Sequence, residues 1–133
     1  MSQPCAEFKF RRVMVIDDAY IDRFLVEKLA KKTCFAEEVL SYESAKAALQ
    51  DLINKPEALP QVIFLDINMP AMNGFEFLAE YEKLPASLLE SCTVIMLSSS
   101  LHPDDRARAA NNPHVKCFLN KPLKPDSLKD LEF

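Results

Sequence analysis

Five short apolar runs alternate with five amphipathic segments along the 133 residues of this chain. The runs are RRVMVID, EEVLSY, VIFL, CTVIMLSSS and HVKCFLN, and each predicts a β-strand. The segments between them carry apolar residues at helical spacing, which predicts helices over 20–32, 44–55, 74–84 and 103–110 and a closing helix from 126. Strands that alternate with helices predict an α/β domain whose parallel sheet is covered by helices on both faces.

The composition of the strands predicts their order in the sheet. The first, third and fourth strands are continuous apolar runs, which are typical of the middle of a doubly covered sheet. The second strand carries Glu37 and Glu38 and the fifth carries Lys116, as suits edge strands. We therefore expect a single doubly wound (βα)5 domain with the flavodoxin-like order 2-1-3-4-5. Ligands of such sheets bind at the carboxyl ends of the strands, beside the switch point between the first and third strands.

Charged and polar side chains stand where these strands end. Asp17 and Asp18 close the first strand, Asp66 the third and Ser98 the fourth, and Lys121 follows the fifth. Two carboxylates about 4 Å apart repel by roughly 4 kcal/mol at an effective dielectric constant near 20, so protons or a cation must offset the crowding. A partly hydrated Mg²⁺ suits such oxygen ligands, and it usually also holds phosphate.

The same set of residues predicts phosphoryl chemistry. Lys121 supplies a compact positive charge for a phosphate oxygen, and Ser98 supplies a hydroxyl donor. Asp66 is a candidate nucleophile, because aspartyl phosphate is an established covalent intermediate. Taken singly, each residue has an ordinary explanation, such as a helix cap at Asp18 or a surface loop at Lys121. Their coincidence at one edge of one sheet favours function.

Composition excludes several other classes of protein. The single glycine, Gly74, argues against a G-x-G-x-x-G dinucleotide loop or a Walker P-loop, which need several glycines. A net charge of -4 without blocks of like charge predicts no nucleic-acid contact. No apolar run approaches the roughly 20 residues of a membrane span, and the N-terminus lacks the order of a secretion signal, so we expect a cytoplasmic protein without membrane contact. The scattered cysteines are interpreted as reduced structural residues: Cys5, Cys34, Cys92 and Cys117.

Four motifs together resemble the receiver domain of two-component response regulators: VMVIDDAYIDR, VIFLDINMPAMNGFEFL, VIMLSSS and FLNKPL. The resemblance covers nearly the whole chain, which divides into an N-terminal extension over 1–10 and a receiver domain over 11–133. It implies a signalling domain that catalyses only its own phosphorylation and slow dephosphorylation, with Asp66 as the phosphoacceptor. It further implies that Asp17, Asp18, Asp66 and the main-chain carbonyl of Asn68 hold Mg²⁺ or Mn²⁺.

The resemblance assigns the remaining roles as well. Lys121 pairs with the phosphate and precedes a cis peptide bond at Pro122. Ser98 is the switch hydroxyl and Phe118 the aromatic switch residue, while Asn68 and Ser100 tune the lifetime of the phosphoryl group. The implied donor is a histidine kinase or a histidine phosphotransfer protein. The implied output surface joins the helix over 103–110, the fifth strand and the closing helix, and it controls a partner or a linked output domain or forms a homodimer.

Two alternatives stay open beside this interpretation. A degenerate receiver, which is never phosphorylated, would act as a protein-binding module, although such proteins usually lose an acidic residue or the lysine. An Asp-nucleophile phosphohydrolase of the haloacid-dehalogenase kind needs Asp-x-Asp after the strand, and here position 68 is asparagine. The closing helix has only about eight residues, 126–133, which is marginal for a helix that must dock.

Overall fold

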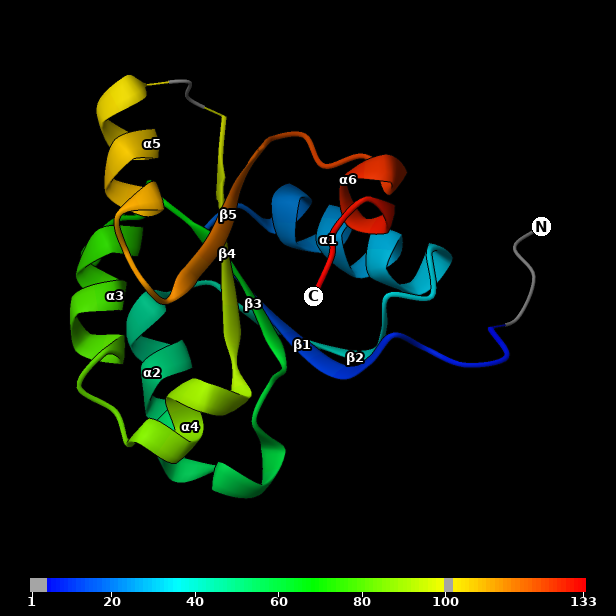
Figure 1. The fold of residues 1–133 in the computed structure, drawn as a ribbon, viewed down its shortest axis with the longest axis horizontal. Helices are drawn as coiled ribbons and strands as arrows, with labels where there is room; N and C mark the ends of the chain where they lie inside the picture. Colours follow the sequence, from blue (N-terminus) through cyan, green and yellow to red (C-terminus); the bar gives the residue numbers. More distant parts are fainter. Residues whose placement is uncertain (1–4, 100–101) are drawn as a thin grey trace.

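The computed structural model describes residues 5–99 and 102–133, which form one five-stranded parallel sheet in the order β2-β1-β3-β4-β5 (Figure 1). The strands are β1 (Phe10–Ile16), β2 (Ala36–Tyr42), β3 (Val62–Asp66), β4 (Thr93–Ser98) and β5 (Val115–Asn120). The predicted α/β class and strand order are confirmed. All five residues of β3 are buried, as the middle of a sheet covered on both faces requires.

Helices cover both faces of the sheet. One face carries α1 (Tyr20–Lys32) and α6 (Pro125–Lys129), and the other carries α2 (Ala45–Asn54), α3 (Gly74–Tyr81) and α5 (Pro103–Ala110) (Figure 1). Two separate apolar clusters fill the space between the sheet and these two helical layers. The helix predicted over 103–110 is therefore α5, and the closing helix is α6.

Two short elements escaped the sequence analysis. The 3₁₀ helix η1 (Pro56–Ala58) precedes β3, and the α-helix α4 (Ala86–Ser91) lies between α3 and β4. Only Leu88 of α4 is buried, so the segment has no apolar stripe that could have predicted a helix. The predicted closing helix was too long, because α6 ends at Lys129. The chain beyond it still packs, since the Phe133 ring lies 4.8 Å from that of Phe10.

The connection from β3 to α3 depends on the only glycine of the chain. Asn73 caps α3: its side chain accepts a hydrogen bond from the backbone N–H of Glu76, whose own side chain bonds back to the Asn73 backbone. Gly74 then passes so close to β3 that an added Cβ would lie 2.6 Å from the Asp66 carbonyl oxygen. The position therefore excludes any side chain, and the helix start is held directly against the backbone of Asp66.

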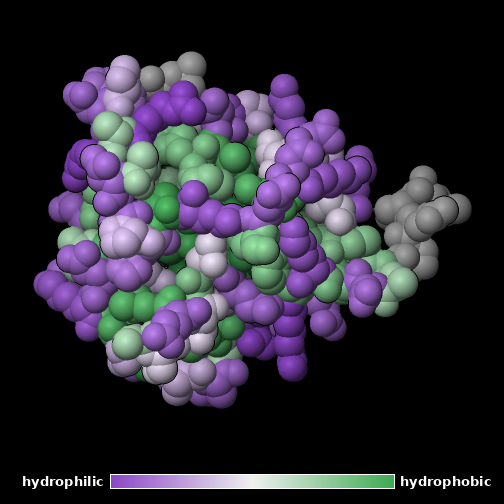
Figure 2. All heavy atoms as spheres, in the orientation of Figure 1, coloured by the Kyte–Doolittle hydropathy of each residue, from purple (hydrophilic) through white to green (hydrophobic). Residues whose placement is uncertain are grey.

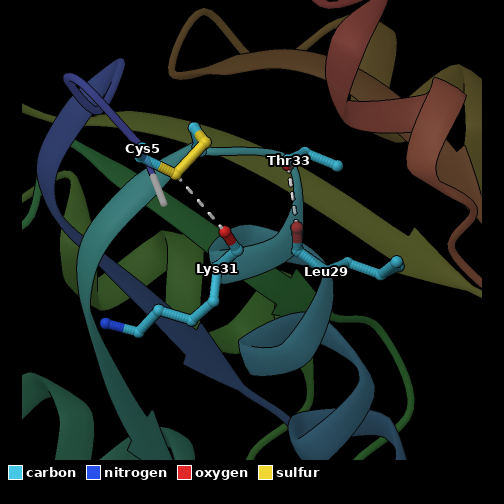
Figure 3. Close-up of a disulfide and its surroundings, with 5 residues drawn as sticks. Cys5, Leu29, Lys31 and Thr33 are labelled. Carbon is cyan, nitrogen blue, oxygen red and sulfur yellow. Dashed lines mark hydrogen bonds between the residues drawn. A yellow bond between two sulfur atoms is a disulfide. The ribbon is translucent and has the colours of Figure 1, made fainter. Parts of the chain in front are cut away.

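The prediction that all four cysteines are reduced is wrong for two of them. Cys5 and Cys34 form a disulfide beside the C-terminal end of α1 (Figure 3). The backbone N–H of Lys9 donates to the Cys34 carbonyl oxygen at 3.0 Å, so the segment that leads into β1 runs alongside the turn that follows α1. This pairing joins cysteines 29 residues apart and follows from the tertiary path, which the spacing alone does not reveal. Cys92 and Cys117 are free.

Within the described ranges, none of the helices has the length and apolar character needed to cross a lipid bilayer.

Candidate functional site

Three buried polar side chains lie at the carboxyl ends of the central strands: Asp17 after β1, Asp66 at the end of β3 and Ser98 at the end of β4. Asp17 is 1% exposed and Asp66 is 4% exposed. The register pairs Ile16 with Leu65, so the two aspartates follow adjacent points of neighbouring strands. The expected gathering of polar groups at one edge of the sheet is therefore present.

Local backbone contacts hold Asp17 in place. Its carboxylate accepts a hydrogen bond from the backbone N–H of Ala19 at 2.9 Å. This contact, between a side chain and the backbone two residues on, forms an Asx-turn just before α1. The Asp17 carbonyl oxygen accepts a hydrogen bond from the Arg23 guanidinium at 2.8 Å, one turn into that helix. These two contacts fix the end of β1, and the Asp17 carboxylate is presented to the site with little freedom.

The Lys121 ammonium is the cationic centre of the site. Its Nζ lies 2.6 Å from the Asp17 carboxylate, 2.9 Å from that of Asp22 and 3.1 Å from that of Asp66. The backbone N–H of Lys121 donates to the Ser98 carbonyl oxygen at 2.9 Å, and the peptide bond to Pro122 is cis. Lys121 therefore bridges the strand ends from β5 to β1 and β3.

Asp22 was not among the predicted site residues. It lies in the first turn of α1, where an acidic residue is ordinary because it favours the helix dipole. The sequence therefore indicates only this ordinary role and not the contact of Asp22 with Lys121. Only the path of α1 past the end of β5 shows that Asp22 reaches Lys121.

Two pKa values in the site are raised, for different reasons. Burial raises the pKa of the Asp66 carboxyl to about 6, and the neighbouring charge of Asp17 acts in the same direction against the opposing effect of Lys121. Burial alone would lower the pKa of the Lys121 ammonium, but its bonds to Asp17 and Asp22 and the charge of Asp66 outweigh burial and raise it. Lys121 thus stays charged, while burial and the charge of Asp17 make Asp66 the carboxyl that is harder to ionise.

Three of the predicted metal ligands are close enough to share one cation. Asp17, Asp18 and Asp66 each offer a carboxylate oxygen, and these oxygens all lie within 4.8 Å of one another. Asp17 and Asp66 are buried and Asp18 is exposed, so the cluster is open to water on one side. An oxygen-only donor set that leaves room for water fits a hard divalent cation. Asn68 is exposed, and its backbone N–H donates to the Asp66 carboxylate.

The predicted switch residues lie on neighbouring strands. Ser98 is buried at the end of β4, and Phe118 is half-buried on β5. The Arg106 guanidinium of α5 lies 5.6 Å from the centre of the Phe118 ring, within the range of a cation–π contact. Arg106 and Phe118 both line a surface hollow between α5 and β5, and hydrophobic side chains gather over this part of β5 (Figure 2). Ser100, a predicted lifetime residue, lies outside the described residues.

Known proteins resemble this chain over most of its length. A sequence profile described as "Response regulator receiver domain" matches residues 13–131. Response regulator Rcp1 from Synechocystis sp. is 31% identical over 123 residues, which cover 90% of this chain and 80% of Rcp1. The sensory/regulatory protein RpfC from Xanthomonas campestris pv. campestris is 26% identical over 125 residues, which span 94% of this chain and only 16% of RpfC.

Solved structures share the fold. The crystal structure of a two component response regulator from Cytophaga hutchinsonii has a TM-score of 0.84 at 34% identity, and the match covers 90% of this chain and 92% of that one. The Mn²⁺-bound form of Rcp1 has a TM-score of 0.72 at 27% identity, with 90% of this chain and 88% of that one covered.

Proposed function

The chain belongs to the response regulator receiver domain family, and we propose that it accepts a phosphoryl group on Asp66 in a Mg²⁺-dependent reaction that switches a binding surface. The observation that carries this proposal is the Lys121 ammonium, which lies 3.1 Å from the Asp66 carboxylate at the edge of a three-carboxylate cluster. A nucleophile, a positive charge and a set of metal ligands thus stand together. Phosphoryl transfer needs mainly this kind of positioning and charge neutralisation.

In the proposed step an oxygen of the Asp66 carboxylate attacks phosphorus. The bond between phosphorus and the leaving group breaks, and its electron pair stays with the leaving group, an imidazole nitrogen for a phosphohistidine donor. The Asp66 carboxylate must be ionised to attack. Since its pKa is about 6 without metal, neutral pH keeps most of it ionised, and a nearby cation favours that form further.

The surrounding residues would hold the incoming group. Asp17, Asp18 and Asp66, with the main-chain carbonyl of Asn68, would hold Mg²⁺ or Mn²⁺. Such a cation neutralises charge on the transferring phosphoryl oxygens when bound. Lys121 would contact a further phosphoryl oxygen from the β5 side. Ser98, buried at the end of β4, would supply a hydroxyl donor to the same group.

The phosphodonor would approach over α1. This helix begins two residues after Asp18, and its first turns expose large apolar side chains: Tyr20 is 66% exposed, Ile21 70% and Phe24 46%. Exposed apolar side chains beside a reactive site suit a protein donor better than a small molecule. We therefore assign the donor to a histidine kinase or a histidine phosphotransfer protein that packs on this end of α1.

The output would pass through α5, β5 and α6. Phosphorylation replaces the single negative charge of the Asp66 carboxylate by the nearly two charges of a phosphoryl group, which would draw in Ser98 and let Phe118 follow. Phe118 lines the hollow between α5 and β5, so its movement would change the surface that a partner, a linked output domain or a second copy of the chain contacts. Asn68 and Ser100 would tune the lifetime of the phosphoryl group.

The intact mass after incubation with acetyl phosphate tests the proposal. We expect a gain of one phosphoryl group, roughly 80 Da, that requires Mg²⁺ and is lost in Asp66→Asn. Glu90→Gln, which changes an exposed carboxylate on α4, is the matched control and should gain the same mass. A folded wild-type protein that never gains mass would overturn the proposal and favour the degenerate receiver, a binding module that is not phosphorylated.

A further inference from the structure

Asp22 forms an ion pair with Lys121 but is not one of the three clustered carboxylates that could share a cation. Its carboxylate lies 2.9 Å from the Lys121 ammonium, a charge-assisted hydrogen bond between the first turn of α1 and the residue that follows β5. The oxygens that could share a cation come from the other three aspartates of the site, 17, 18 and 66. The role of Asp22 is therefore to be sought in what it does to Lys121.

The Lys121 ammonium is already fully partnered by carboxylates, with hydrogen bonds to Asp17 and Asp22 and an ion pair with Asp66. An ammonium group carries three N–H bonds and accepts none. Its Nζ has three carboxylates within 3.1 Å, those of Asp17, Asp22 and Asp66. A phosphoryl oxygen that binds Lys121 must therefore displace one of them.

The structure indicates which carboxylate is displaced. Asp66 is the group that receives the phosphoryl group. The Asp17 side chain is 1% exposed and is fixed by a hydrogen bond from the backbone N–H of Ala19. Loss of Lys121 would leave a buried carboxylate without its cationic partner, which is costly. The Asp22 side chain is 33% exposed, so water can replace Lys121 at little cost.

We propose that Asp22 is a positioning residue that competes with the phosphoryl group for Lys121, and so sets how tightly the site holds that group. This inference rests on the proposed function. In the resting protein Asp22 and Asp17 together hold the ammonium of Lys121 beside Asp66. On phosphorylation the Lys121 ammonium would bind a phosphoryl oxygen in place of the Asp22 carboxylate, which would then be hydrated. Removing the charge at Asp22 should therefore strengthen binding of the phosphoryl group.

Beryllofluoride, a small anion that mimics a bound phosphoryl group, measures this competition. We would titrate it into the protein at saturating Mg²⁺ and follow binding by NMR for the wild type, Asp22→Asn and Asp22→Glu. The dissociation constant should fall about three- to tenfold in Asp22→Asn, because a charged hydrogen bond at a partly exposed site is weakened there. Asp22→Glu keeps the carboxylate and should stay near the wild type. Glu27→Gln removes a carboxylate from a later turn of α1 and is the matched control.

The direction of the change separates this role from a structural one. Damage to α1 or loss of support for Lys121 would weaken binding, so an unchanged or raised dissociation constant in a folded Asp22→Asn protein overturns the inference. In that case the wild type still binds, and the proposed function stands. If the wild type binds no beryllofluoride at saturating Mg²⁺, the proposed function is overturned, and the role of Asp22 with it.

Discussion

Replacing Asp66 by asparagine should stabilise the metal-free protein. The pKa of this carboxyl rises from its ordinary value of 3.8 to about 6 on folding, chiefly because the group is buried and also because Asp17 lies beside it. The folded protein thus binds the Asp66 proton more tightly than the unfolded chain does. The stability linked to this proton is fully present below pH 3.8 and is lost as the pH rises through 6.

The shift sets the size of the effect. Roughly two pKa units correspond to about 3 kcal/mol of folding free energy, which the ionised Asp66 costs the protein above pH 7. An asparagine side chain carries no charge at any pH, so Asp66→Asn should be more stable than the wild type by about 2 to 3 kcal/mol at pH 7.5. The difference should shrink as the pH falls and should vanish near pH 4.

Urea unfolding followed by circular dichroism measures this difference. The chain has no tryptophan, so the far-ultraviolet signal of the helices is the natural probe. The experiment needs a chelator throughout. Adding Mg²⁺ in a second series should then stabilise the wild type more than Asp66→Asn, because the cation offsets the crowding. An Asp66→Asn protein that is no more stable than the wild type at pH 7.5 in chelator would refute the claim that the buried, ionised Asp66 destabilises the fold.

Three further changes test other parts of the fold. Gly74→Ala places a Cβ 2.6 Å from the Asp66 carbonyl oxygen. It should therefore lower the free energy of unfolding in urea by about 1 to 3 kcal/mol and slow labelling by acetyl phosphate. Wild-type values for both measurements would contradict this contact. Ala71 has a φ of 67°, in the left-handed region that favours glycine. Ala71→Gly should therefore raise the urea midpoint and increase the free energy of unfolding by up to about 1 kcal/mol, and a lower midpoint would exclude backbone strain at this position. Reducing the disulfide of Cys5 and Cys34 should lower stability by up to about 3.5 kcal/mol and expose two more alkylatable thiols, whereas four reactive thiols before reduction would refute the bond.

The sequence predicted the sheet well because its strands differ so plainly in composition. The order β2-β1-β3-β4-β5 followed from apolar runs in the middle and from Glu37, Glu38 and Lys116 at the edges. The polar edge of the sheet followed too, since parallel strands deliver their last residues to the same side. Periodicity and strand-end chemistry are local signals, and a sequence displays them directly.

What the sequence did not reveal depends on tertiary paths. Asp22 looks like an ordinary acidic residue in a first helical turn until α1 is seen to pass the end of β5. Cys5 and Cys34 meet because the segment before β1 runs along the turn after α1. Gly74 stands out in the sequence only as the single glycine, and the reason for a glycine there is the backbone of Asp66, which only the packing of α3 brings near.

The central claim is that Asp66 itself carries the phosphoryl group, and borohydride trapping tests it most directly. Borohydride reduces an aspartyl phosphate to homoserine, and peptide mass spectrometry then locates the changed residue. After treatment with acetyl phosphate and Mg²⁺, we expect homoserine at position 66 and at no other aspartate of the cluster. Without Mg²⁺ it should be absent. Homoserine in place of Asp17 or Asp18, or none anywhere in a folded protein, would contradict the account.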